Sequence, residues 1–319
     1  MATGIHGVRV KCQGKFSGSG EFTLALYSDP FTADPFTGHH SMGWAAELKL
    51  EFDDQGERTR LRRKGSFGPL YIQKPFYPEG NLCHLYLLHP PGGVAGGDTL
   101  AFHANVKSGA QVLITNPAAT KFLRSDSKLA QQQQFIKVAD CASAEWLPQE
   151  TIVFNDAHAQ NKTVVQLDGN AAFVGCEVVS LGRPASQEKF VSGTYESLLR
   201  LERYCATTDR YRVVFLDHQR YSGASTELDQ SWGLAGKPVF GMMVATPVDE
   251  DILGSFQRLQ AKMTGPEEPV YSTLIGNVLV MRCVGESTST VLDQLRARWS
   301  LLRPTMLQRA PHIPDIWRT

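Results

Sequence analysis

Glycine is concentrated in one short stretch, His89–Leu100, which reads His-Pro-Pro-Gly-Gly-Val-Ala-Gly-Gly-Asp-Thr-Leu. Two prolines and four glycines in this stretch exclude a helix or a long strand and predict a bent loop. The glycines imply either positive φ angles or packing too close for a Cβ atom; they are Gly92, Gly93, Gly96 and Gly97. Their spacing resembles a phosphate-binding P-loop, but Asp98 stands where that loop has lysine and would repel phosphate. We therefore predict a rigid turn that ends in one carboxylate.

Carboxylates are the second group of residues that could do chemistry. In the run Ala172–Leu181, period-two alternation places Glu177 on a face that is otherwise apolar, and the opposite face is nearly apolar too. A buried carboxylate normally acquires a partner or a raised pKa. Glu150, with its neighbours Glu145 and Asp156, has a similar setting. Two interpretations stay open: each carboxylate caps backbone amides, or several of them line a polar interior.

Two cations, Lys121 and Arg124, could pair with such carboxylates or belong to a solvated surface turn. The sequence has no G-x-S-x-G elbow, no H-E-x-x-H zinc helix and no G-x-G-x-x-G dinucleotide loop. The histidines also lack the spacing of a permanent metal site. These patterns predict neither a catalytic centre nor a resident metal.

The elements that position these residues are predicted to be strands. Leu48, Leu50 and Phe52 alternate with charged residues, and similar short runs recur along the chain. The recurring runs are Leu100–Val106, Gln111–Thr115, Gln134–Val138, Thr151–Phe154, Thr163–Leu167, Ala172–Leu181, Leu198–Tyr204, Arg212–Leu216 and Phe240–Ala245. This pattern predicts a mainly all-β fold, an extended β-helix-like or sandwich winding of many short strands.

Two α-helices are predicted late in the chain. The first has a start signal at Thr246-Pro247-Val248-Asp249, with Thr246 as the capping residue, and should end at Gly265–Pro266. The second should run from about Thr288 until Pro304 stops it. A β-hairpin is predicted between the two helices, because Gly276–Asn277 separates two strand-like runs.

Composition limits the class of protein. The 319 residues carry 32 basic and 32 acidic side chains, a balance that argues against a nucleic-acid-binding protein. No apolar run is long enough to span a membrane, and no signal peptide is evident, so we expect a cytoplasmic protein with reduced cysteines. We predict one β-rich domain over residues 44–319. Residues 1–43, which hold a tandem Asp-Pro-Phe-Thr repeat, are expected to be a poorly ordered extension or short strands.

Several unusual motifs resemble the urease accessory protein family UreD, called UreH in some organisms. They are Gly68–Leu70, Gln73–Gly80, His89–Asp98, Pro117–Ser125, Glu145–Glu150, Leu181–Pro184 and Pro314–Thr319. Order and spacing agree with the family from about Trp44 to the C-terminus, whereas residues 1–43 have no counterpart. Asp315 also departs from the pattern, because the family generally carries arginine there.

The resemblance implies a non-enzymatic maturation factor with a wound β fold and a pair of helices. Such a protein is expected to bind urease apoprotein, to form a complex with UreF and the GTPase UreG, and to support delivery of Ni²⁺ as a transient cargo, with no permanent cofactor. Carboxylates hold Ni²⁺ more weakly than Cys or His ligands do and could release it. The resemblance also implies a passage for the metal through the β fold, and we predict that Asp98, Glu150 and Glu177 line it, with Glu145 and Asp156 nearby.

Other functions remain possible on the sequence alone. The protein could be a scaffold that only bridges UreF to urease while the metal travels elsewhere. It could be a β-helical carbohydrate-active enzyme that uses paired carboxylates such as Glu145 and Glu150, although such enzymes usually carry an export signal. An oligomeric structural β-protein would require repeats of constant period, which the sequence does not show.

Overall fold

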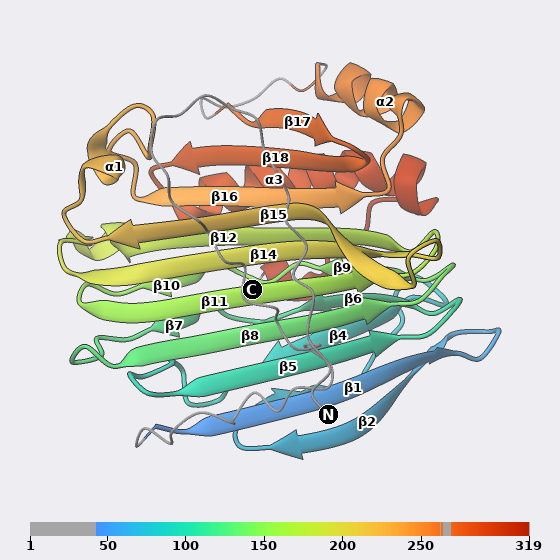
Figure 1. The fold of residues 1–319 in the computed structure, drawn as a ribbon, viewed down its shortest axis with the longest axis horizontal. Helices are drawn as coiled ribbons and strands as arrows, with labels where there is room; N and C mark the ends of the chain where they lie inside the picture. The colour runs from blue at the N-terminus through green and yellow to red at the C-terminus, as the bar shows by residue number, and fades with distance from the viewer. Residues whose placement is uncertain (1–42, 262, 264–268, 319) are drawn as a thin grey trace, which may run out of the picture. The chain divides into compact units, whose positions relative to one another are not determined.

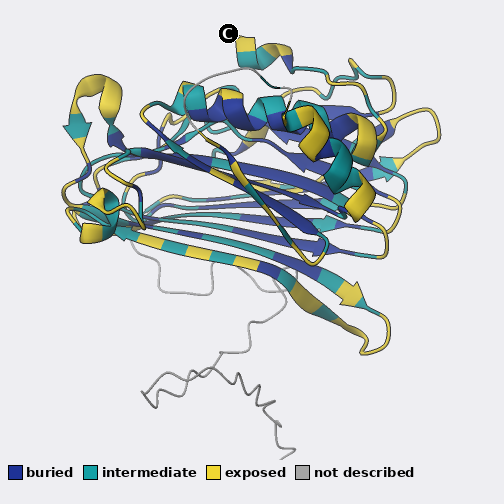
Figure 2. Ribbon diagram, turned by 90° about the horizontal axis from the view of Figure 1, so that it is seen from above, coloured by how far each residue is buried: buried dark blue, intermediate teal, exposed yellow. Residues whose placement is uncertain are grey.

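The computed structural model describes residues 43–261, 263 and 269–318. The described residues belong to one compact unit. The extension predicted for residues 1–43 lies outside the described part except for Gly43, and the predicted helix end at Gly265–Pro266 also lies outside it. The described chain is mainly β-strand, as predicted, and forms two large sheets that face each other, with helices against one of them (Figures 1 and 2).

The first sheet has seven strands in the order β15-β14-β11-β8-β5-β1-β2. Their bounds are β1 Ala45–Asp54, β2 Thr59–Phe67, β5 Thr99–Val106, β8 Leu129–Val138, β11 Ala157–Leu167, β14 Gly193–Cys205 and β15 Arg210–Ser222. The five inner strands pair in parallel, and the edge strands β2 and β15 pair antiparallel.

The second sheet has eleven strands, with a main path in the order β17-β18-β16-β12-β9-β6-β4-β3. Its bounds are β3 Tyr71–Ile72, β4 Cys83–Leu88, β6 Gln111–Thr115, β7 Thr120–Phe122, β9 Ser143–Trp146, β10 Thr151–Val153, β12 Ala172–Arg183, β13 Glu188–Lys189, β16 Val239–Thr246, β17 Tyr271–Ile275 and β18 Val278–Gly285. The predicted hairpin is confirmed as β17 and β18.

The chain winds between the two sheets like a β-helix. It passes from β4 to β5, β6, β8, β9, β11, β12 and β14, and each return adds a strand parallel to an earlier one. At one corner of the winding, successive coils place Val94, Phe122, Val153 and Leu181 side by side. All four are buried, so this corner is an apolar column that fixes the stacking of the coils.

Two hydrophobic clusters hold the fold together. One fills the space between the sheets, where the alternation predicted for Leu48, Leu50 and Phe52 is confirmed by their burial. The other lies between the second sheet and the helices α2 (Glu250–Gln260) and α3 (Thr288–Leu302). The remaining helical segments are short: α1 Thr226–Asp229, η1 Pro184–Ser186, η2 Arg303–Leu307 and η3 Asp315–Arg318.

Both ends of α2 differ from the prediction, because the helix already ends at Gln260, before the predicted Gly265–Pro266. Thr246 is the last residue of β16, where it pairs with Phe173, and it does not cap the helix. Asp249 is the N-cap instead, because its side chain accepts a 2.8 Å hydrogen bond from the amide of Ile252. The second helix was predicted correctly, and its apolar face is buried against the sheet.

The glycine-rich loop uses both properties that the sequence implied. Gly92 and Gly97 adopt positive φ angles of 80° and 94°. Gly93 and Gly96 allow close packing, because an added Cβ atom would lie 2.8 Å from the Leu123 side chain and 2.5 Å from the Ser125 carbonyl oxygen. The loop therefore packs directly against the next coil.

We expect Gly96→Ala to lower the free energy of unfolding by about 1–3 kcal/mol, because the new methyl group meets backbone that cannot move aside easily. Gly65→Ala is the matched control, since no atom lies within 4 Å of its Cβ position. Chemical denaturation should show a change within about 0.5 kcal/mol for the control. Equal effects of the two substitutions would contradict close packing at Gly96.

Candidate functional site

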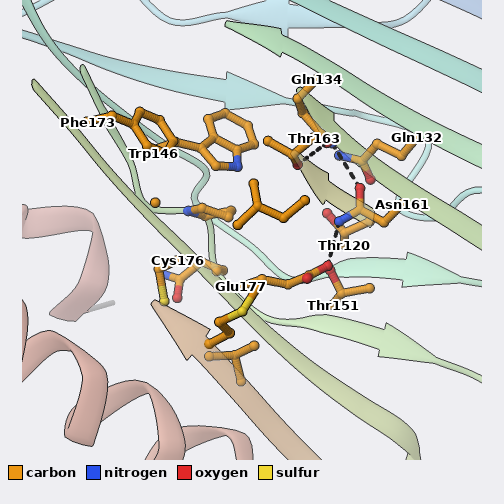
Figure 3. Close-up of a pocket in the computed structure, with 16 residues that line it drawn as sticks. Thr120, Gln132, Gln134, Trp146, Thr151, Asn161, Thr163, Phe173, Cys176 and Glu177 are labelled. Carbon is orange, nitrogen blue, oxygen red and sulfur yellow. Dashed lines mark hydrogen bonds between the residues drawn. The ribbon is translucent and has the colours of Figure 1, made fainter. Parts of the chain in front are cut away.

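A small cavity lies between the two sheets and is lined by polar side chains (Figure 3). Its volume is about 30 Å³, which is room for about two water molecules. The polar lining residues are Thr120, Gln132, Gln134, Gln149, Thr151, Asn161, Thr163 and Glu177. The cavity thus interrupts the hydrophobic cluster that fills the space between the sheets.

Strand register brings these polar side chains together. Asn161 on β11 lies directly beside Gln132 on β8 and Ser197 on β14. Two residues further along the same strands, Thr163 on β11 lies beside Gln134 on β8. Because alternate residues of a strand share one face, all of these positions point toward the second sheet. Glu177 approaches them from β12 on that opposite sheet.

A continuous chain of hydrogen bonds crosses the space between the sheets (Figure 3). The Thr163 hydroxyl donates to Gln134 Oε1 at 2.8 Å, and Gln134 Nε2 donates to Asn161 Oδ1 at 3.1 Å. Asn161 Nδ2 then donates to Glu177 Oε1 at 2.7 Å. Two more donors reach the same carboxylate: the Tyr195 hydroxyl at 3.0 Å and the Ser197 hydroxyl at 2.6 Å.

The surroundings of Glu177 influence its protonation in opposite directions. Burial raises the pKa of this carboxyl, and hydrogen bonds from Ser197, Asn161 and Tyr195 offset only part of that effect. Burial, followed by the nearby Glu177, also raises the pKa of Tyr195, so its hydroxyl keeps its proton and remains a donor. A nearby cation would favour the ionised form of this carboxyl group.

A larger hollow of about 320 Å³ lies next to the cavity. The two spaces share four lining residues, namely Thr120, Gln132, Trp146 and Pro148. The hollow is bordered by the glycine-rich loop and by residues 116–121, and Pro90, Gly92 and Lys121 are exposed at its rim. The glycine-rich loop thus forms one wall of this hollow.

The cavity offers mainly oxygen atoms to a cation. Among the described residues, no group of three or more His, Cys, Asp or Glu side chains is arranged to hold a metal ion. Cys176 also lines the cavity, but burial raises the pKa of its thiol and keeps it from becoming a thiolate ligand. Amide, hydroxyl and carboxylate oxygens bind divalent nickel more weakly than thiolate or imidazole groups do.

Of the predicted site residues, Glu177 is the one that lines this cavity. Alternation left the direction of its side chain open, and its hydrogen bond from Asn161 shows that it points toward the first sheet. Glu150 is partly exposed and is not part of the lining, although Gln149 and Thr151 on either side of it are. In this three-residue segment the chain therefore directs a neutral side chain, not the carboxylate, toward the cavity.

Glu145 has a structural role instead of lining the passage. It is 2% exposed and accepts hydrogen bonds from Trp299 Nε1 at 2.6 Å and from Arg303 Nε and Nη2 at 3.1 and 3.0 Å. The Arg303 guanidinium also donates to both oxygens of Glu79, at 2.7 and 3.0 Å. This buried cluster joins the end of α3 to the second sheet, and it makes Glu145 unavailable to a substrate.

The remaining predicted residues are also explained locally. Asp98 accepts from the amides of Trp44 at 2.8 Å and Ala95 at 2.9 Å, so it caps its own loop and is removed from the site. Asp156 accepts from the Ser192 hydroxyl at 2.9 Å on the outer part of the winding. Lys121 and Arg124 are exposed, and among the described residues no ion pair joins them to the buried carboxylates.

Glu79 gives the buried cluster a pH dependence. Burial opposes ionisation of Glu79, but hydrogen bonds from His84 and Arg303 outweigh it and lower the pKa from 4.5 to about 2. A lowered pKa stabilises the folded state above pH 4.5, and the effect is lost as pH falls toward 2. Glu79→Gln should therefore cost on the order of 3 kcal/mol at neutral pH and much less at about pH 3. Urea denaturation at both pH values measures this.

Glu57→Gln provides the control for that measurement, because Glu57 is exposed in the turn before β2. Its stability should follow that of the unmodified protein at both pH values. A Glu79→Gln deficit that stays constant with pH would show that the lost contacts, and not the charge of Glu79, stabilise the cluster.

Sequence reasoning missed most of the cavity. Gln132, Gln134, Asn161, Thr163 and Ser197 are polar residues at inward-facing positions of strands whose other inward positions are apolar. That break in the alternation was a usable signal. It could not show that the five positions meet, because their register joins strands far apart in the chain.

The fold is that of a β-solenoid protein with a polar cavity between its two sheets. The family described as UreD urease accessory protein matches residues 45–318, and the chain belongs to this family. It is 36% identical over 277 residues to the urease accessory protein UreD of Pseudomonas putida, which covers 87% of this chain and 95% of that protein. It is 38% identical over 281 residues to urease accessory protein UreD 2 of Brucella anthropi, covering 88% and 100%. The UreD protein of Pseudomonas entomophila is 34% identical over 297 residues, covering 93% and 100%.

Within the described residues, none of the helices has the length and apolar character that crossing a membrane requires.

Proposed function

We propose that this protein is a cytoplasmic, non-enzymatic urease maturation factor that binds urease apoprotein. In this proposal it acts with UreF and UreG to support nickel delivery, and Ni²⁺ moves through the polar cavity that ends at Glu177. Membership of the UreD family supports the urease accessory role. The hydrogen-bonded chain that leads to Glu177 is the observation that carries the passage.

The hydrogen-bonded chain of polar side chains lowers the stability of the fold. Apolar side chains at the same inward positions would avoid the desolvation of amide, hydroxyl and carboxyl groups, which is only balanced when every group finds a partner. Nearby inward positions such as Ile136 and Val165 are apolar and fully buried. The polar side chains at these inward positions are therefore better explained by the binding of a cargo than by the stability of the fold.

The chemistry of the lining suits a cargo that must be released. Oxygen ligands attract a divalent cation without the affinity of a thiolate or an imidazole site. The size of the cavity leaves room for about two water molecules, so a cation would exchange part of its hydration shell for Gln134, Asn161 and Glu177. Ionisation of Glu177 as the cation arrives would supply the opposite charge.

The alternative of a carbohydrate-active enzyme with paired carboxylates receives no support from these positions. Glu145 is buried in its cluster with Arg303 and Trp299, so it cannot act with Glu150 on a substrate. A scaffold without a passage differs from our proposal only in the route of the metal.

Co-expression with the urease subunits tests the urease accessory role. The protein is expected to be captured with tagged urease apoprotein, and urease activity should depend on its presence when UreF and UreG are also supplied. Failure of the protein to associate with urease apoprotein under these conditions would overturn the proposed function.

A further inference from the structure

The strand β2 carries a concentrated positive charge at the edge of the first sheet. Residues 57–64 contain one acid and five bases in a chain whose total charge is zero. Arg62 and Lys64 pair with Asp53 at 2.7 Å and Glu51 at 2.8 Å on β1. Among the described residues, no ion pair includes the exposed Arg60, so part of this charge is not balanced locally.

A hollow of about 590 Å³ adjoins this edge, and basic residues from two segments meet there. Arg60 is in β2 and Arg58 directly precedes it, and Lys74 comes from the segment that runs beside β4. Aromatic rings complete the lining: Phe76, and Tyr77, over which the Arg58 guanidinium lies at 4.8 Å. The hollow therefore combines cations with apolar surface.

Because β2 is an edge strand, it also has backbone groups that could pair with a bound peptide. In the described sheet β2 pairs with β1 alone, so along most of its length the backbone groups of its other edge face outward. An extended segment can add to such an edge through main-chain hydrogen bonds. Alternate side chains of an extended segment repeat at about 6.8 Å, which is also the spacing of alternate basic residues along β2.

Charge on an edge strand can also serve only to prevent aggregation. The opposite edge strand of the same sheet, β15, carries exposed Arg210 and Arg212 and shows what such protection looks like. At β2, a second basic segment and two aromatic rings are added to the charged edge, and protection requires neither. The comparison favours a binding surface at β2.

We propose that β2 and the adjoining hollow bind an extended acidic segment of a partner protein, which adds to the sheet as a strand. Its carboxylates would contact Arg58, Arg60 and Lys74, and its apolar side chains would contact Phe76 and Tyr77. Sites for isolated phosphate groups are usually built from clustered backbone amides or helix N-termini, and a strand edge supplies neither. This proposal is independent of any passage for nickel.

The test measures binding of a fluorescent peptide of alternating Glu and Val to the full-length protein by anisotropy. The combined variant Arg58→Gln, Arg60→Gln and Lys74→Gln should weaken binding by about tenfold or more at low salt. The combined variant Arg210→Gln and Arg212→Gln on β15 should change it by less than about twofold. Both variants replace exposed side chains, and matching thermal unfolding of each would establish that they fold.

Three results would overturn the proposal. One is equal weakening by the β2 and β15 variants, which would mean that only overall charge matters. Another is equally tight binding of a control peptide in which Lys replaces each Glu. The third is displacement of the acidic peptide by inorganic phosphate or by a single-stranded oligonucleotide with higher affinity, which would assign the surface to phosphate groups.

Discussion

Replacing Arg303 with methionine is expected to lower the free energy of unfolding by about 3–5 kcal/mol. Arg303 is fully buried and donates two hydrogen bonds to each of two carboxylates, those of Glu79 and Glu145. Methionine fills similar volume but leaves both carboxylates without their cation, and an uncompensated buried charge is costly. Urea denaturation at neutral pH, followed by circular dichroism, measures the loss.

A surface arginine provides the control for this substitution. Arg318 pairs with Asp315 at 3.5 Å, and both side chains are largely exposed, so Arg318→Met should change stability by less than about 1 kcal/mol. The Arg303→Met deficit should also shrink as pH falls, because protonation removes the unpaired charges from the interior. A deficit no larger than that of Arg318→Met would contradict the structural importance of the cluster.

Glu177→Gln is expected to reduce urease activation by about tenfold or more while the protein still associates with urease. The substitution keeps the size of the side chain, so the cavity stays open, but it removes the ionisable group whose negative charge would balance the charge of the cation. Asn161 and Tyr195 can still donate to the amide oxygen, and the Ser197 hydroxyl can accept from the new NH2 group, which limits damage to the fold. Urease activity after co-expression, normalised to co-purified protein, is the measurement.

Glu150→Gln is the matched control, because Glu150 lies in a neighbouring segment and is not part of the cavity lining. It should activate urease like the unmodified protein. The sequence alone predicted the same role for both residues, so this pair separates the structural account from the sequence-based one. Equal loss in both variants would point to general damage and not to a passage.

Local patterns predicted much of the fold. Period-two alternation located the strands, and 3.6-residue periodicity located α3 with the residues that it buries. The winding was also anticipated, because many short strands separated by turn residues suit a wound β fold. The start of α2 was wrong because β16 extends through Thr246, and sheet pairing competed with a good local capping signal.

Contacts between distant residues could not be predicted in this way. Arg303 and Glu79 are 224 residues apart, and nothing local to either residue indicates the other. Glu145 and Trp146 are adjacent and point in opposite directions, toward α3 and into the space between the sheets respectively. Which of them faces inward depends on the neighbouring coils, so Glu145 was assigned to a passage from which the fold excludes it.

The most direct test of the account is the nickel content of urease. Urease should be purified after co-expression with UreF, UreG and each form of this protein, and its nickel measured by mass spectrometry relative to protein. We expect urease made with Glu177→Gln to contain about tenfold less nickel than urease made with Glu150→Gln, although both variants are captured with urease equally well. Equal nickel content with the two variants would contradict a passage through the cavity at Glu177.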